Sequence, residues 1–164
     1  MKRALLLTGQ LGTGKTALIK EALATTAVKG GGFYTEEIRA GGIRQGFRIV
    51  ALDGREAVLA HVSISSPHQV SKYQVDTDAL ERVGVAALRQ ALKESDLIII
   101  DEIGKMELLS PQFKEVVMQA INGGKKVLGT IMLNPHPEVE VLLVTRDNRR
   151  RIVNEVLDWL TAVN

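Results

Sequence analysis

An octapeptide near the start of the chain, GQLGTGKT at residues 9–16, combines three glycines with a lysine and a hydroxyl side chain. Glycines let a loop turn tightly enough for successive backbone N–H groups to point inward, and a helix that begins there adds its own unpaired N–H groups. Such a loop binds phosphate oxygens, while Lys15 neutralises the β- and γ-phosphates and the Thr16 hydroxyl binds Mg²⁺. The pattern predicts a nucleotide-binding segment made of Gly9, Gln10, Leu11, Gly12, Thr13, Gly14, Lys15 and Thr16.

Two adjacent carboxylates, Asp101 and Glu102, follow an aliphatic run at residues 97–100. On their own, acids at the end of a buried strand are most simply residues that have reached water. The phosphate loop changes this interpretation, because its metal ion needs a carboxylate from a neighbouring parallel strand. We therefore expect Asp101 to hold Mg²⁺ with Thr16, and Glu102 to orient or deprotonate the attacking water. Side chains alternate along a strand, so the second role requires the chain to bend at the strand end.

Two further candidates lie on or after later strands. Thr130 lies on the strand-like run KKVLGTIM, which we expect between the other two site strands, where a polar residue contacts the γ-phosphate. Asn134 is the second candidate for this role, and an ordinary strand-end threonine is the alternative. Arg146 follows the last strand, where it would stack on a base or neutralise phosphate charge. Of the other charged residues, Glu107 either faces the site or is solvated, and Arg149–Arg151 are expected on a solvated helix face.

The elements that must position these residues alternate between strand and helix at both ends of the chain. Between the ends, residues 31–64 hold three strand-like runs separated by the hairpin dipeptides Gly41-Gly42 and Asp53-Gly54. Residues 65–75 read as a loop with an uncertain short strand. The pattern predicts a single α/β domain over residues 1–164, with a mostly parallel sheet, flanking helices and an antiparallel meander at about 31–64.

Composition narrows the function classes. The 164 residues carry a net charge of only +2 and 4% aromatic residues, which argues against a nucleic-acid partner. The chain has no cysteine, so thiolate chemistry and cysteine-based zinc sites are excluded. No apolar run reaches the roughly 18–20 residues of a membrane span, and the opening MKRALLLTG develops no signal-peptide core. A cytoplasmic protein without a membrane partner is the expectation.

Beyond these general features, the sequence resembles a known family in the segments GQLGTGKT, GGFYTEEIR, GGIRQGFRIVALDG and DEIGKMELLSPQF, with LGTI and VTRDNR adding to the match. It is similar to the THEP-type nucleoside-triphosphatases, a P-loop family that includes a cancer-related nucleoside-triphosphatase. The first motif is general among P-loop proteins, whereas GFYTEE and DEIGKMEL are much more specific. The resemblance implies a variant of the RecA-type fold and slow, Mg²⁺-dependent hydrolysis of nucleoside triphosphates with broad base tolerance. It also implies a second nucleotide-binding segment, made of Leu97, Ile98, Ile99, Ile100, Asp101, Glu102, Ile103 and Gly104.

Three functions remain open from the sequence. The first is hydrolysis of nucleoside triphosphates by a monomer, with the arginine finger supplied by Arg146 or by an unknown activating partner. The second is a small-molecule or nucleotide kinase, whose acceptor pocket would use the meander residues Arg39, Arg44 and Arg48. The third is a nucleotide-dependent switch or nucleic-acid-binding module without catalysis.

Overall fold

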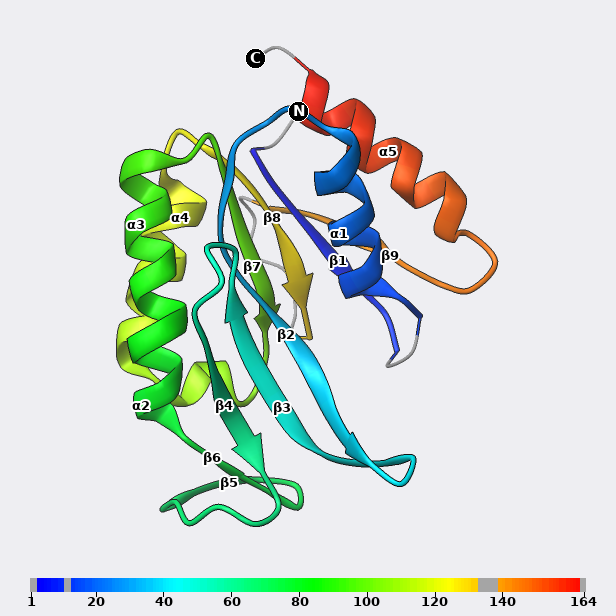
Figure 1. Cartoon of the computed structure of the whole chain (residues 1–164). Coiled ribbons are helices and arrows are strands. Elements are labelled where there is room, and N and C mark those ends of the chain that lie inside the picture. The colour runs from blue at the N-terminus through cyan, green and yellow to red at the C-terminus, as the bar shows by residue number, and fades with distance from the viewer. Residues whose placement is uncertain (1–2, 11–12, 133–138, 163–164) are drawn as a thin grey trace.

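In the described part of the chain, nine strands form a central mixed sheet, with helices on both faces (Figure 1). The computed structural model describes residues 3–10, 13–132 and 139–162. The strands are β1 (Ala4–Thr8), β2 (Gly30–Ala40), β3 (Ile43–Ala51), β4 (Glu56–His61), β5 (His68–Val70), β6 (Tyr73–Val75), β7 (Leu97–Ile103), β8 (Lys126–Ile131) and β9 (Val139–Leu143). The helices are α1 (Lys15–Thr25), α2 (Thr77–Ala79), η1 (Leu80–Val85), α3 (Ala86–Glu94), η2 (Glu107–Leu109), α4 (Pro111–Asn122) and α5 (Arg149–Thr161).

The strand order is β5-β6-β4-β3-β2-β7-β8-β1-β9, and pairing is parallel from β2 to β9. The remaining pairs are antiparallel, so the sheet has a parallel part and a meander part that share β2. This confirms the predicted α/β fold with an antiparallel extension, and β8 does lie between β7 and β1. The carboxyl ends of these three parallel strands therefore meet at one edge of the sheet, where ligands bind in such folds.

Strand β7 shows why its sequence is aliphatic without interruption. Ile98 and Ile100 belong to the core beneath α3 and α4, whereas Leu97 and Ile99 belong to the core beneath α1 and α5. All four side chains are fully buried. A strand covered by helices on both faces has no side on which a polar residue is favourable until it reaches its end. In this chain, Asp101 is the first polar residue of β7, two positions before the strand ends at Ile103.

Two segments differ from the sequence expectation. Residues 65–75, expected as a loop with an uncertain short strand, contain the hairpin β5–β6, and β6 extends the meander by pairing with β4. The helical segment before β7 is irregular, because Leu80–Val85, between α2 and α3, is a π-helix. Gly84 lies in that segment, where an added Cβ would come 2.7 Å from the Ile49 side chain. The absence of a side chain at Gly84 therefore lets the helix approach β3 closely.

Helix α4 begins with Ser110 as N-cap and Pro111 in the first turn. The Ser110 hydroxyl accepts a hydrogen bond from the Phe113 N–H at 3.1 Å and donates one to Glu81 Oε2 at 2.7 Å. Because Ser110 is buried, Ser110→Ala would leave both partners unsatisfied, and we expect it to lower the free energy of unfolding by about 1–2 kcal/mol. Urea unfolding measures this loss. Ser63→Ala, at an exposed serine, is the control, and equal midpoints for the two variants would contradict the capping role.

Among the residues that the structure describes, no helix combines the length and the apolar character that crossing a membrane requires.

Candidate functional site

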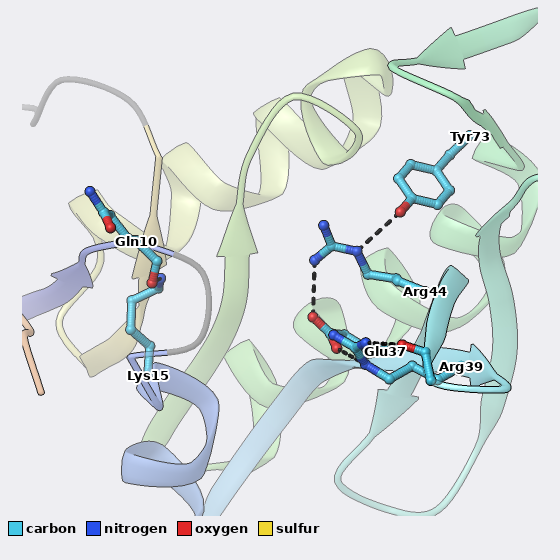
Figure 2. Close-up of polar contacts among 7 residues, drawn as sticks. Gln10, Lys15, Glu37, Arg39, Arg44 and Tyr73 are labelled. Carbon is cyan, nitrogen blue, oxygen red and sulfur yellow. Dashed lines mark hydrogen bonds and ion pairs between the residues drawn. The ribbon is translucent and has the colours of Figure 1, made fainter.

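The phosphate loop connects β1 to α1, and glycine is required at both of its described bends. Gly9 has φ of +150°, and an added Cβ would lie 2.4 Å from the Val144 carbonyl oxygen. Gly14 adopts the left-handed conformation, with φ of +85°, at the N-cap of α1. The Lys15 ammonium donates hydrogen bonds to the carbonyl oxygens of Gly9 at 2.7 Å and Gln10 at 3.1 Å (Figure 2). The other predicted loop residues, Leu11 and Gly12, lie outside the described residues.

Asp101 joins three elements that are distant in sequence. Its Oδ2 accepts a hydrogen bond of 2.5 Å from the Thr16 hydroxyl on α1, and its Oδ1 accepts one of 2.6 Å from the Thr130 hydroxyl on β8. The side chain is 2% exposed. Burial raises the pKa of Asp101 above its ordinary value, against the opposing effects of the two hydroxyls and of Lys15. The structure thus brings the two candidate metal ligands into direct contact, with Thr130 beside them.

Glu102 faces the same cavity as Asp101. The ladder of β7 with β8 is irregular between Ile100 and Ile103. The chain therefore departs from regular strand geometry at the point where the proposed role requires it. Both carboxylates line a cavity of about 840 Å³ that also contains Lys15 and Thr16. Burial, and secondarily the charge of Asp101, raises the pKa of Glu102.

A third acid, Glu107, completes this wall of the cavity. It lies on η2, the short turn after β7, and is 4% exposed. An added Cβ on Gly104 would lie 2.9 Å from Glu102 Oε1 and 3.0 Å from Glu107 Oε1, so the glycine leaves room for both carboxyl groups. Burial raises the pKa of Glu107 to about 8, and the charges of Glu102 and Asp101 act in the same direction. Of the two alternatives from the sequence, the buried, site-facing one is found.

The arginines after β9 differ in how close they lie to the phosphate loop. Arg146 is exposed in a turn, and the described lining of the cavity does not include it. Arg149 instead lies against the phosphate loop, because an added Cβ on Gly14 would be 3.0 Å from its Nε. Arg149 and Arg150 also form ion pairs with Glu21, at 3.4 and 3.2 Å. The expectation of a fully solvated face is therefore wrong for Arg149, and the role assigned to Arg146 stays a prediction. Asn134, the second candidate beside Thr130, lies outside the described residues.

The wall opposite the phosphate loop comes from the meander. Its lining includes Glu37 on β2, Arg44 and Phe47 on β3, and Tyr73 on β6. Arg44 is the only one of the three meander arginines proposed for an acceptor pocket that lines the cavity in the described structure. Sequence reasoning missed Glu37 and Tyr73, although Glu37 belongs to the specific motif GFYTEE.

The donor set fits a magnesium ion that is shared with a substrate. One hydroxyl and one carboxylate, from Thr16 and Asp101, are oxygen ligands, and Mg²⁺ in nucleotide sites commonly takes one or two protein oxygens together with phosphates and water. Within the described residues, no group of three or more His, Asp or Glu side chains is arranged to hold a metal ion without substrate. The geometry therefore suits an ion that arrives with phosphate.

Comparison with known proteins identifies the family of the chain. A family model described as NTPase matches residues 4–157, almost the whole chain. The chain belongs to this NTPase family. The resemblance seen in its motifs is thereby confirmed.

Relatives of this NTPase family match over nearly their full lengths. A protein from Thermotoga maritima named nucleoside-triphosphatase THEP1 is 46% identical, over 95% of this chain and 94% of its own. The crystal structure of THEP1 from Aquifex aeolicus has a TM-score of 0.87 at 31% identity, covering 97% of this chain and 99% of the other. The solution structure of a human cancer-related nucleoside triphosphatase has a TM-score of 0.80 at 35% identity, covering 99% of each chain.

Proposed function

We propose that this protein hydrolyses nucleoside triphosphates to diphosphates and phosphate, as the names of its relatives indicate for them. The observation that carries the proposal is the 2.5 Å contact between Thr16 and Asp101, which are 85 residues apart in the sequence. This contact joins the phosphate loop to the strand-borne acid at the mouth of a cavity large enough for a nucleotide.

The roles of the residues follow from their positions. The loop N–H groups and Lys15 bind the phosphates, and Thr16 and Asp101 would hold Mg²⁺, which shields the charge of the phosphate oxygens when bound. Thr130 fixes the orientation of Asp101 by its hydrogen bond. Glu102 accepts the proton of the attacking water or orients that water toward the γ-phosphorus. The roles of Lys15, Thr16, Asp101 and Glu102 are the ones predicted from the sequence. Thr130, predicted to contact the γ-phosphate, is instead assigned here to hold Asp101.

Broad base tolerance and slow turnover also belong to this proposal. The loop recognises phosphate and not the base, which supports acceptance of several nucleotides. A monomer in the cytoplasm, without a nucleic-acid partner, stays a prediction.

Phosphate release tests the proposed function directly. The wild-type protein should release phosphate from ATP, GTP, CTP and UTP in the presence of Mg²⁺, and a chelator should abolish the release. The same assay should include candidate phosphate acceptors, because Arg44, one of the arginines considered for an acceptor pocket, lines the cavity. Transfer that occurs only when an acceptor is present would instead establish the kinase alternative.

Lys15→Ala should weaken nucleotide binding by roughly 10- to 100-fold, because the charge-assisted contacts to phosphate are lost. Titration with a fluorescent nucleotide measures the Kd. Lys114→Ala, which removes an exposed lysine on α4, is the matched control and should bind as the wild type does. Equal affinity of the two variants would exclude the loop as the phosphate site.

A further inference from the structure

A β-bulge sets the direction of Arg44. In the pairing of β2 with β3, Ile38 lies opposite Gly46 and Arg39 lies opposite Arg44, so Gln45 is an extra residue on β3. Residues three apart on a regular strand point to opposite faces, but the bulge returns Arg44 to the face of Phe47. The Arg44 guanidinium accordingly lies 5.4 Å from the centre of the Phe47 ring. Bulges of this kind often redirect a side chain beside an active site.

Two side chains hold the redirected guanidinium by hydrogen bonds. Its Nε donates a 3.0 Å hydrogen bond to the Tyr73 hydroxyl, and its Nη1 donates one of 3.0 Å to Glu37 Oε1. Figure 2 shows the guanidinium between these two partners, with Lys15 and Gln10 on the opposite side of the view. The hydrogen bond with Tyr73 and the contact with Glu37 raise the pKa of Arg44, against the opposing effect of burial, so the cation stays charged.

The held guanidinium keeps donors for a ligand. Within the described part of the chain, Nη2 donates no hydrogen bond to protein, and Arg44 is only 26% exposed. Arg44 and the phosphate loop line the same cavity. Of the described lining residues, Arg44 is the only arginine, and a planar guanidinium can bind two oxygens of one phosphate.

The charge of the cavity lining requires such a cation. The described lining carries more acids than bases: the acids are Glu36, Glu37, Asp101, Glu102 and Glu107, and the bases are Lys15, Arg44 and Lys105. A nucleoside triphosphate adds several negative charges, and hydrolysis concentrates charge on the γ-phosphate oxygens. Among the bases of the described lining, Lys15 lies on the loop side, Lys105 follows β7, and Arg44 lies on the meander side.

We propose that Arg44 is an arginine finger supplied by the same chain, which binds the γ-phosphate from the meander wall of the cavity, with Tyr73 and Glu37 as its positioning residues. This inference rests on the proposed nucleotide function and adds a residue to it. It replaces Arg146, which is exposed and outside the described lining, in that role.

Arg44→Gln tests the proposal, with Arg39→Gln as the matched control. Arg39 lies opposite Arg44 and also pairs with Glu37, at 2.8 Å, but it does not belong to the described lining. Arg44→Gln should lower kcat on the order of 10²-fold, whereas Arg39→Gln should retain wild-type turnover. The Kd for a nucleoside diphosphate should stay unchanged in Arg44→Gln, while the Kd for a non-hydrolysable triphosphate analogue should rise about tenfold.

Tyr73→Phe separates positioning from structure, because it removes one hydroxyl and keeps the ring. It should lower kcat less than Arg44→Gln does, and the double variant should be no slower than Arg44→Gln alone. A structural role of Arg44 would lower thermal stability and leave the preference for triphosphate over diphosphate intact.

The outcomes also distinguish this inference from the function on which it rests. Suppose that the wild-type protein hydrolyses triphosphates, but Arg44→Gln matches Arg39→Gln in kcat and in triphosphate preference. This result overturns the role of Arg44 and leaves the proposed function intact. If Arg44→Gln weakens the binding of diphosphate and triphosphate equally, the role of Arg44 is also overturned, because Arg44 would then contact a part of the nucleotide other than the γ-phosphate. Absence of hydrolysis in the wild type itself would overturn the proposed function instead.

Discussion

Glu102→Gln is expected to lower kcat on the order of 10³-fold while the affinity for nucleoside triphosphate stays within a few-fold of wild type. Glutamine keeps the size of the side chain and removes its capacity to accept the proton of the attacking water. Binding is expected to persist because Lys15, Thr16 and Asp101 are unchanged. Removal of a negative charge beside the phosphates would, if anything, tighten binding slightly.

Single-turnover phosphate release and nucleotide titration measure the two quantities separately. Glu115→Gln, at an exposed acid on α4, is the control and should behave as the wild type does. Full phosphate release by Glu102→Gln would show that another group handles the water. The closest alternative would then be Glu107, which lines the same cavity.

Glu107→Gln is expected to raise the free energy of unfolding by roughly 3–5 kcal/mol above pH 8, and to change it little at pH 4. The pKa of Glu107 is about 8 in the folded protein and 4.5 in its ordinary state, mainly because burial disfavours the charged form. Between these values the folded state keeps a proton that the unfolded state loses. The wild-type contribution therefore falls as pH rises from about 4.5 to about 8, and is constant outside that window. Glutamine imitates the protonated acid and removes this dependence.

Urea unfolding across pH 4–9, without nucleotide and with a chelator present, tests this linkage, because a metal ion would favour the ionised acids. The relevant quantity is the difference between Glu107→Gln and wild type at each pH, with Glu115→Gln as the exposed control. A difference that does not grow with pH would show that Glu107 is ionised in the folded protein at neutral pH.

Local sequence patterns predict the parallel part of the fold and the half of the site that is made of the phosphate loop and Asp101. The phosphate motif, the uninterrupted aliphatic run of β7 and the capping residues of α4 each act over a few neighbouring positions. The order of β1, β8 and β7 then brings Thr16, Asp101 and Thr130 together, because parallel strands end at the same edge.

The meander half of the site could not be predicted in the same way. The hairpin β5–β6 consists of two strands of three residues each, too short to show a periodic pattern, and it forms because β4 offers a free edge. The direction in which the Arg44 side chain points depends on an extra residue in β3, which only the pairing register reveals. The burial of Glu107 likewise depends on a single turn after β7.

The hydroxyl contacts of Asp101 also affect what happens when a nucleotide arrives. A threonine hydroxyl has one donor and two lone pairs, so Thr16 can keep donating to Asp101 and still offer a lone pair to a cation. Thr130 holds the other carboxylate oxygen and need not move. The conformational entropy of the Asp101 side chain is therefore lost when the protein folds, not when the nucleotide binds. Nucleotide binding then requires little rearrangement on this side of the cavity.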